Sequence, residues 1–240
     1  MTRVVTHIGE TSMQHLAIIP DGNRRWAAQN KLESFFGHKK GLEAVRSAIK
    51  VSIKNGIKYL SFYTFSLENF KRGDEEKSYL FSLLSGEFKK WTPELITQKI
   101  RIKFLGDTHY FPSGIRSTIK ELEEQTKDGN VLQLNLLFCY GAQQEIVSAV
   151  QALAQQVKAG TLDVNSIDVD MVKNSLWTAG MPDPDLVIRT GKVTRLSNFL
   201  LYQSAYSEYL FLDSFWPEMT EEILESCLQK FPSIKRNFGT

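Results

Sequence analysis

The sequence predicts a single α/β domain, with a mainly parallel central sheet of about six strands flanked by helices. Short apolar stretches typical of buried strands alternate along the chain with amphipathic stretches of roughly 10–20 residues. No internal repeat, low-complexity tract or linker rich in Gly, Pro or Ser divides the 240 residues, so one domain over 1–240 is expected. Strands and helices in alternation form βαβ units, which build parallel sheets with helices on both faces.

The first part of the chain predicts three strands and two helices. Leu16–Ile19 is a run of apolar residues that indicates a short strand. Residues 41–55 carry apolar side chains at helical spacing and end in an Asn-Gly pair, which stops a helix. Residues 58–65 (KYLSFYTF) favour a strand, 75–96 have apolar residues along one side of a longer helix, and 100–105 (IRIKFL) form a third strand.

The second part continues the alternation. Residues 112–127 are expected to be helical, 131–138 form a nearly continuous apolar strand, and 144–158 form another helix. A short apolar strand over 186–188 runs into Arg189. The remaining predictions are a sixth strand at 209–212, a final helix at about 220–231, and a flexible N-terminal extension over residues 1–13.

Composition excludes several classes of protein. With 29 Lys+Arg against 27 Asp+Glu, the net charge of +2 is too small to indicate a nucleic-acid partner. No window approaches the roughly 20 apolar residues of a transmembrane helix, and the N-terminus lacks the apolar run of a signal peptide. The two cysteines, Cys139 and Cys227, match no metal-binding spacing and suggest unpaired thiols in a reducing compartment. We therefore expect a soluble cytoplasmic protein.

Polar groups follow three of the predicted strands at the point where each strand ends. PDGNRR (20–25) follows the first strand, SLEN (66–69) follows the second, and RTG (189–191) follows a later one. Ligands of parallel sheets bind outside the carboxyl ends of the strands. These side chains are therefore expected to converge on one rim of the sheet.

The candidate residues are rich in arginine, although the whole chain is nearly neutral. Guanidinium groups bind phosphate oxygens bidentately, and Mg²⁺ typically takes one or two carboxylates, here Asp21 and Glu208, together with substrate phosphates. The predicted ligand is an anionic phosphate ester, with or without a bound metal. Neither a GxxxxGK[ST] loop nor a GxGxxG motif is present, which argues against P-loop and dinucleotide enzymes. The candidates are Asp21, Asn23, Arg24, Arg25, His38, Asn69, Arg72, Arg189, Arg195, Ser197 and Glu208.

Each candidate also has a purely structural explanation. A single arginine is more often a solvated charge than a ligand, and Asp21 in PDGN is typical of an Asx-turn. His38 could cap the helix that follows it, and Glu208 could lie on the surface of a half-buried strand. The functional interpretation gains weight because several such groups follow strands.

The chain resembles the cis-prenyltransferase family in six motifs, in order and at the right spacing, over about residues 15–239: HLAIIPDGNRRWA, FGHKKG, YTFSLENFKR, FLGD, RTG-x-x-x-RLSNFLLYQSAYSEYLF and WPE. The resemblance implies an α/β homodimer with an apolar tunnel for the growing chain. It implies a Mg²⁺-dependent enzyme that condenses isopentenyl diphosphate with an allylic diphosphate, with farnesyl diphosphate as the expected one. The product would be a polyprenyl diphosphate such as undecaprenyl diphosphate, a lipid-carrier precursor for cell-wall synthesis, released through transient contact with a membrane.

The resemblance also implies roles for individual residues. Asp21 would be the metal-linked catalytic carboxylate, Ser66 and Asn69 would assist proton removal, and Glu208 would complete the Mg²⁺ site, from the same or the partner subunit. The allylic diphosphate would be bound by Gly22, Asn23, Arg24, Arg25 and His38, with Arg72 closing the SLEN motif, and isopentenyl diphosphate by Arg189, Arg195 and Ser197. Trp26 and Phe70 would pack at the tunnel mouth, and the tunnel lining would include Thr64, Leu83, Leu84, Leu132 and Leu134.

The chain departs from the family pattern after Arg189. The family usually reads RTGGExRxSNFL, whereas this chain reads RTGKVTRLSNFL, so Lys192, Val193 and Thr194 replace Gly, Glu and a variable residue. Glycine allows a positive φ that lysine adopts only with strain. Two other functions stay open: a non-catalytic scaffold subunit of the family, and a relative that condenses two short allylic diphosphates into a branched or cyclic product.

Overall fold

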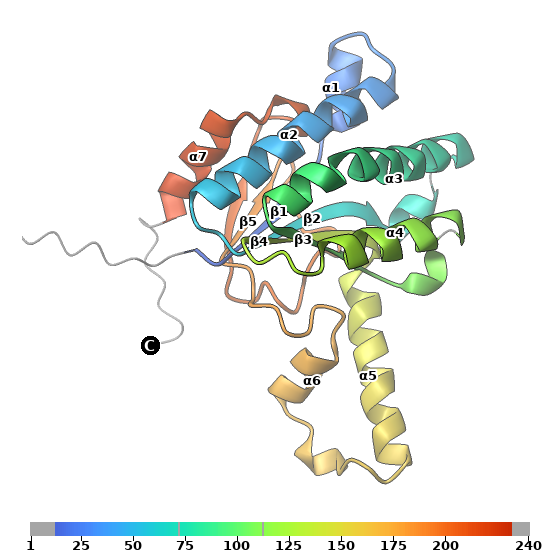
Figure 1. Cartoon of the computed structure of the whole chain (residues 1–240). Helices are drawn as coiled ribbons and strands as arrows, with labels where there is room; N and C mark the ends of the chain where they lie inside the picture. The colour runs from blue at the N-terminus through green and yellow to red at the C-terminus, as the bar shows by residue number, and fades with distance from the viewer. Residues whose placement is uncertain (1–12, 72, 112, 232–240) are drawn as a thin grey trace, which may run out of the picture.

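The computed structural model of the chain describes residues 13–71, 73–111 and 113–231. Six strands form one sheet in the order β3-β4-β2-β1-β5-β6, and all neighbouring strands are parallel (Figure 1). The predicted fold class, an α/β domain with a mainly parallel six-stranded sheet, is therefore confirmed. The strands are β1 (His15–Ile19), β2 (Tyr59–Ser66), β3 (Ile100–Leu105), β4 (Leu132–Tyr140), β5 (Leu186–Arg189) and β6 (Glu208–Phe211).

The helices are α1 (Asn23–Gln29), α2 (Ser34–Lys54), α3 (Asp74–Thr97), α4 (Ser113–Thr126), α5 (Ala142–Lys158), α6 (Val169–Ser175) and α7 (Glu221–Lys230). Five of them match the predicted helices, with ends that differ by a few residues except at the start of α2. Within the described residues, no helix combines the length and the apolar character needed to cross a lipid bilayer.

The sheet is buried on both faces, and alternate residues of β1 belong to two separate cores. Leu16 and Ile18 lie in the larger core, which contains side chains of α2, α3, α4 and α7. Ala17 and Ile19 face the other side, where Phe199 and the start of α5 cover them. Figure 1 shows α7, α2, α3 and α4 over one face, with α1 beyond the upper end of α2 and with α5 and α6 extending away from the sheet. A strand buried on both faces reads as a continuous apolar run, which is how the sequence identified β1.

Two helices were not predicted, and one begins earlier than expected. The tip after β1 was interpreted as a turn, but Asn23–Gln29 form α1. Helix α2 begins at Ser34 rather than at 41, so His38 lies inside a helix instead of capping one. Gly37, in the first turns of α2, has a packing role: a Cβ there would lie 2.0 Å from the carbonyl oxygen of Asn23. Helix α6 is short and polar, and no apolar period indicated it.

The predicted N-terminal extension falls almost wholly on residues 1–12, which lie outside the described residues. Met13 belongs to the fold, because it packs against the larger core.

A buried polar network ties the amino end of β1 to its neighbours. His15 is 1 % exposed; its Nδ1 lies 2.7 Å from the carbonyl oxygen of Pro182 and its Nε2 lies 2.7 Å from Ser61 Oγ. Asn135 Nδ2 donates to the same Ser61 oxygen at 3.1 Å. The Pro182 carbonyl can only accept, so Nδ1 carries the proton and Nε2 accepts from the Ser61 hydroxyl. Burial lowers the pKa of His15 to about 4, and the ring is held neutral.

This network makes the stability of the protein depend on pH. Between about pH 6.5 and about pH 4, the unfolded chain binds a proton at His15 that the folded chain excludes. The free energy of unfolding should therefore fall by up to about 3 kcal/mol as the pH falls through this window. Urea denaturation across the window should show a flatter profile for His15→Gln, whereas His109→Gln, at a histidine whose side chain is 93 % exposed, should keep the wild-type slope. Parallel profiles for wild type and His15→Gln would contradict this account.

Candidate active site

The carboxyl ends of three adjacent strands bring the predicted polar tips together. In the sheet, β1 lies between β2 and β5, and Ile19 pairs with Arg189. Asp21 follows β1, Ser66 ends β2 and Arg189 ends β5. The expected convergence on one rim is therefore present in the structure.

Asp21 is the centre of a hydrogen-bonded cluster. Its Oδ2 accepts from Arg189 Nη2 at 2.8 Å, and its Oδ1 accepts from Arg25 Nη2 at 2.8 Å. The Arg189 side chain is only 4 % exposed, compared with 45 % for Arg25. Burial alone would raise the pKa of Asp21, but the hydrogen bonds from Arg189 and Arg25 outweigh it and hold the pKa below its usual value. Asp21 is therefore an ionised carboxylate between two guanidinium groups.

The residues after Arg189 fix the backbone of this cluster. The Thr190 hydroxyl donates to the Asp21 carbonyl oxygen at 2.7 Å and accepts from the Asp21 amide at 2.9 Å. The Gly191 carbonyl accepts a short hydrogen bond from Arg25 Nη1. At φ 92, Gly191 lies so close that a Cβ there would be 2.7 Å from Arg25 Nη2. Only glycine allows this approach.

The loop that follows carries Arg195 and Ser197 to the same place. Arg189 Nη1 donates to Ser197 Oγ at 2.8 Å and to the Arg195 carbonyl oxygen. Arg195 is exposed, and none of the described carboxylates lies within ion-pair distance of its guanidinium. The Tyr63 hydroxyl, on β2, lies 3.2 Å from the Ser197 carbonyl oxygen, so the loop is attached to the sheet from two sides.

The SLEN segment lies at the end of β2. Ser66 is its last strand residue, and Leu67–Lys71 form a short 3₁₀ helix. Asn69 Oδ1 accepts from the Ser66 amide at 3.3 Å. Phe70 packs against the rings of Phe65, Phe81 and Tyr110. Arg72 lies outside the described residues.

A second group of predicted residues lies around α1. Gly22 precedes the helix at φ 106, and a Cβ there would be 2.5 Å from Phe215. Arg24 Nη1 lies 3.8 Å from one Glu76 oxygen, and His38 Nε2 lies 3.8 Å from the other. Glu76, in the first turn of α3, was not among the candidates. Trp26 is half-buried on α1.

A small cavity begins beside this group and leads into apolar side chains. Its volume is about 100 Å³. Asn23 and His38 line its polar end, and Thr64 and Leu83 are among the residues of the predicted tunnel that reach it. Leu132 and Leu134 lie in the larger core instead, as buried residues of β4. Trp26 and Phe70 do not line the cavity. The full lining is Pro20, Asn23, His38, Gly41, Leu42, Val45, Thr64, Phe65, Leu80, Leu83, Phe138 and Trp216.

Two buried polar atoms at the site lack a hydrogen-bond partner among the described residues: Asn23 Oδ1 and Arg189 Nε. Buried polar groups are nearly always paired, and an unpaired one is a place where a ligand or water can bind. The chain therefore presents unused hydrogen-bonding capacity on both sides of Asp21.

Glu208 does not join Asp21 within one chain. It begins β6 and pairs with Leu186, whereas Phe211 pairs with Arg189. A strand rises about 3.3 Å per residue, so Glu208 lies about 10 Å back toward the amino ends of the strands. The described residues contain no group of three or more His, Cys, Asp or Glu side chains placed to hold a metal.

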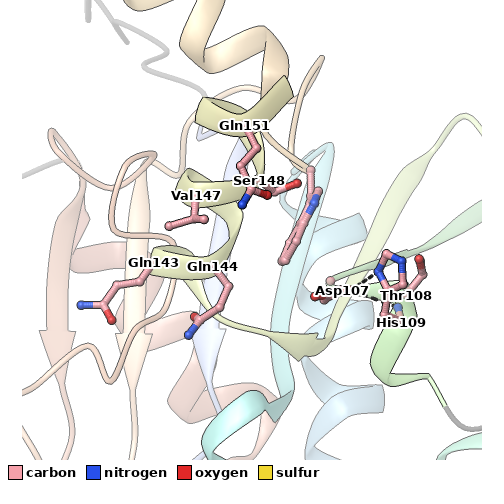
Figure 2. Close-up of a pocket in the computed structure, with 10 residues that line it drawn as sticks. Asp107, Thr108, His109, Gln143, Gln144, Val147, Ser148 and Gln151 are labelled. Atoms are coloured by element: carbon pink, nitrogen blue, oxygen red, sulfur yellow. Dashed lines mark hydrogen bonds and ion pairs between the residues drawn. The ribbon is translucent and has the colours of Figure 1, made fainter. Parts of the chain in front are cut away.

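A larger cavity of about 640 Å³ lies between the loop after β3 and helix α5 (Figure 2). Figure 2 shows Gln143, Gln144 and Ser148 on α5, with the hydrogen-bonded pair Asp107 and His109 across from them. Among the described residues, no arginine or lysine lines this cavity. The Asp21 cluster, which has several cations, is the better candidate for an anionic ligand.

Residues that the sequence did not identify hold the site together. Thr190, Tyr63 and Glu76 each contact a candidate residue that is distant in the chain. Thr190 could have been included, because it stands inside the RTG string that drew attention to Arg189. No sequence pattern pointed to Tyr63 or Glu76, because their roles depend on how α3 and the loop pack.

The close approach of Gly191 can be tested by Gly191→Ala. The new Cβ would meet Arg25 and the Asp21 backbone at 2.7–3.1 Å, and φ is 92. We expect the free energy of unfolding to fall by about 2–3 kcal/mol, the sum of left-handed strain and a clash. Gly160→Ala is the matched control, because Gly160 has φ 71 with nothing within 4 Å. It should lose only the strain, about 1 kcal/mol. Equal losses by urea denaturation would mean that Gly191 does not pack against Asp21 and Arg25.

Comparison with known proteins agrees with this geometry. The family model described as "Putative undecaprenyl diphosphate synthase" matches residues 19–239. The chain is 40% identical to an isoprenyl transferase of Agrobacterium fabrum over 226 residues, which cover 94% of this chain and 92% of the relative. It is 38% identical to the ditrans,polycis-undecaprenyl-diphosphate synthase ((2E,6E)-farnesyl-diphosphate specific) of Micrococcus luteus over 226 residues, covering 94% and 91%.

Solved structures share the fold. A probable undecaprenyl diphosphate synthase of Campylobacter jejuni superposes with a TM-score of 0.79 at 28% identity, covering 95% of this chain and 99% of that one. The lavandulyl diphosphate synthase of Lavandula x intermedia, in complex with dimethylallyl diphosphate, superposes with a TM-score of 0.92 at 30% identity, covering 95% of this chain and 99% of that one. The family match spans nearly the whole chain and includes the ends of β1, β2 and β5 where the polar cluster forms. With that cluster in place, the chain belongs to the undecaprenyl diphosphate synthase family of prenyltransferases.

Proposed function

We propose that the protein condenses isopentenyl diphosphate with an allylic diphosphate to make a cis-polyprenyl diphosphate such as undecaprenyl diphosphate, a lipid-carrier precursor for cell-wall synthesis. In this reaction the carbon–oxygen bond of the allylic diphosphate breaks and pyrophosphate leaves. A carbon–carbon bond forms to isopentenyl diphosphate, which then loses a proton. The observation that carries the proposal is the Asp21 carboxylate, held between Arg25 and Arg189 on the ligand-binding edge of the sheet.

The charges around Asp21 suit two diphosphates. Arg24 and His38 lie on the α1 side, where the allylic diphosphate would bind with Gly22, Asn23 and Arg25. Arg195 and Ser197 lie on the loop side with Arg189, where isopentenyl diphosphate would bind. Guanidinium groups in a partly buried site stabilise the charge that develops on the departing pyrophosphate. Ser66 and Asn69, with Arg72, would orient isopentenyl diphosphate for proton removal.

The carboxylate of Asp21 fits a Mg²⁺ ion that is also bound by the phosphates of the substrate. Mg²⁺ usually binds one or two protein carboxylates and substrate phosphates, so a single carboxylate such as Asp21 is sufficient on this chain. When bound, Mg²⁺ would neutralise part of the pyrophosphate charge. Both Asp21 oxygens already accept hydrogen bonds from arginines, which keep the carboxylate ionised and oriented.

A homodimer is the proposed assembly. Beyond β5, one face of β6 is only partly covered by the described residues: Tyr209 and Phe211 stack there at 6.1 Å, and they are 36% and 39% exposed. Leu201 and Tyr206 are also exposed on the preceding segment. A second copy on this face could bring its Glu208 toward the first copy's Asp21, which Glu208 cannot reach within one chain. A cytoplasmic location stays a prediction, supported by the two buried, unpaired cysteines.

We also propose that the small cavity is the closed start of a tunnel for the growing chain. Its volume of about 100 Å³ is below the range of roughly 300–1,000 Å³ that ligands of drug size occupy. Helices α2 and α3 would therefore have to separate when a long prenyl chain enters. The polar end at Asn23 and His38 and the apolar interior match an amphiphile with a charged head.

A branched or cyclic product, made from two short allylic diphosphates, is the second candidate. The lavandulyl diphosphate synthase structure is similar along its whole length, so a relative that joins two short allylic diphosphates stays a second candidate. The higher identity to the Micrococcus luteus enzyme favours chain elongation. A non-catalytic scaffold has less support, because the Asp21 cluster is complete.

The decisive experiment incubates the protein with Mg²⁺, isopentenyl diphosphate and farnesyl diphosphate, and measures product length by mass spectrometry. A polyprenyl diphosphate is expected. Asp21→Asn should fold but lose at least ~10²-fold in turnover, because the negative charge is removed. Asp107→Asn, in the cavity of Figure 2, should keep the wild-type rate. A near wild-type rate for Asp21→Asn would refute the assigned role.

Two further arms of the same experiment separate the alternatives. With dimethylallyl diphosphate as the only substrate, a branched or cyclic product would favour the second candidate. Because a polyprenyl product is nearly insoluble in water, we propose transient membrane contact for its release. Phospholipid vesicles should then speed multiple turnovers and leave the first turnover unchanged.

The tunnel proposal is tested by Leu83→Trp. A larger side chain in the cavity should stop elongation early, so the products should be shorter. Ile96→Trp is the control, because Ile96 is 48% exposed on the same helix and should leave product length unchanged. Unchanged product length for Leu83→Trp would place the growing chain elsewhere.

A site shared between two copies predicts complementation. Asp21→Asn and Glu208→Gln should each be inactive alone. When equal amounts of the two variants are dissociated and reassembled, about half of the dimers should contain one copy of each variant. In each of these mixed dimers one of the two sites has both Asp21 and Glu208, so about a quarter of the wild-type activity should return. No recovery, with mixed dimers confirmed by native mass spectrometry, would mean that Glu208 does not serve the partner's site.

A further inference from the structure

Lys192 adopts a backbone conformation that calls for a functional explanation. Its φ is 59, in the left-handed region, directly after Gly191 at φ 92. Lys31 and Lys99 have similar φ values, 57 and 55, but they follow the C-terminal ends of α1 and α3, where left-handed residues commonly stop a helix. Lys192 ends no helix. Strained residues of this kind concentrate at ligand-binding sites, where the surrounding structure holds them.

The surrounding structure attaches Lys192 to the Asp21 cluster. Its amide donates to the Leu212 carbonyl oxygen at 3.1 Å, which fixes the loop against the end of β6. Its Nζ lies 5.6 Å from the centroid of the Phe215 ring. The guanidinium of Arg25 lies 5.4 Å from the same centroid. Lys192 and Arg25 therefore share one aromatic ring beside the carboxylate.

The positive charge of Lys192 is not neutralised by the protein. The side chain is exposed, and no carboxylate of the described residues lies within ion-pair distance of its ammonium group. Asp21 is already bound by two arginines, and Arg195 has no carboxylate partner among the described residues either. The loop from 191 to 197 thus carries two cations, Lys192 and Arg195, that no described carboxylate neutralises.

We propose that Lys192 is a specificity-determining residue that binds the diphosphate of isopentenyl diphosphate; this inference rests on the proposed function. Lys192 stands in the same loop as Arg195 and Ser197, whereas Arg24 and His38 lie around α1, where both face Glu76. When the diphosphate is bound, the ammonium leaves the Phe215 ring and contacts a phosphate oxygen. The aromatic ring holds the free ammonium near its ligand in the meantime.

The test compares Lys192→Gly and Lys192→Gln with Lys99→Gly. Lys192→Gly removes the charge and the left-handed strain together, and Lys192→Gln removes the charge alone. Lys99→Gly is a matched control, since it removes an exposed lysine at the same φ, next to the amino end of β3 and away from the site. Both Lys192 variants should raise the KM for isopentenyl diphosphate by about tenfold, as expected for one lost charge-assisted contact. The KM for farnesyl diphosphate should change less than about twofold, and the difference should shrink at high salt.

Each outcome decides the inference. An unchanged KM for isopentenyl diphosphate, equal changes for both substrates, or the same effect from Lys99→Gly would overturn it. If the wild-type protein converts neither substrate, the proposed function fails first. Calorimetric binding of inorganic pyrophosphate to wild type and Lys192→Gly then tests the lysine separately: weaker binding by the variant supports a phosphate contact, and equal binding removes it.

Discussion

The buried guanidinium of Arg189 is the group on which the site depends. A charge that is 4% exposed must be neutralised and hydrogen-bonded, or folding becomes costly. Asp21 supplies the opposite charge, and the Ser197 hydroxyl and the Arg195 carbonyl supply further acceptors. The hydrogen bonds of the Arg189 guanidinium therefore fix three segments relative to one another: the tip of β1, the end of β5 and the loop that follows β5.

The same arrangement separates a charged compartment from an apolar one. Cations gather outside the strand ends, and within a short distance Asn23 and His38 border a cavity that continues between apolar residues of α2, α3 and β2. Glycines at 37 and 41 bring α1 against α2, because a β-carbon at either would strike Asn23. Close helix packing thus places the polar end of the cavity beside the Asp21 cluster, which suits a molecule with a charged head and a hydrocarbon tail.

The local pattern of apolar residues was enough to predict the sheet and the polar groups at the carboxyl ends of its strands. The features that the sequence did not predict depend on packing between distant parts of the chain. Strands such as β1 and β3 were evident from apolar runs, and parallel pairing then required Asp21, Ser66 and Arg189 to meet. Helix α1 was missed because Gly22-Asn23 resembles a turn, although the left-handed Gly22 starts a helix. The start of α2 was missed because its first turns pack against α1, where a Cβ at Gly37 or Gly41 would strike Asn23, and no local pattern shows such a contact. Glu208 was paired with Asp21 because both are acids among the candidate residues, and the family resemblance then kept it at the metal. Only the strand register shows that within one chain it lies at the other end of the sheet.

The two open edges of the sheet are protected unequally. Along β3, Arg101 and Lys103 alternate with buried residues, and charged side chains on an edge strand discourage other strands from adding to it. Along β6, the exposed side chains are Tyr209 and Phe211, which offer no such charge. If a second copy covers the β6 edge, as in the proposed homodimer, a newly made chain would be prone to aggregate at this edge until it dimerises. Mutations that weaken the proposed contact would then reduce the yield of soluble protein before they affected catalysis.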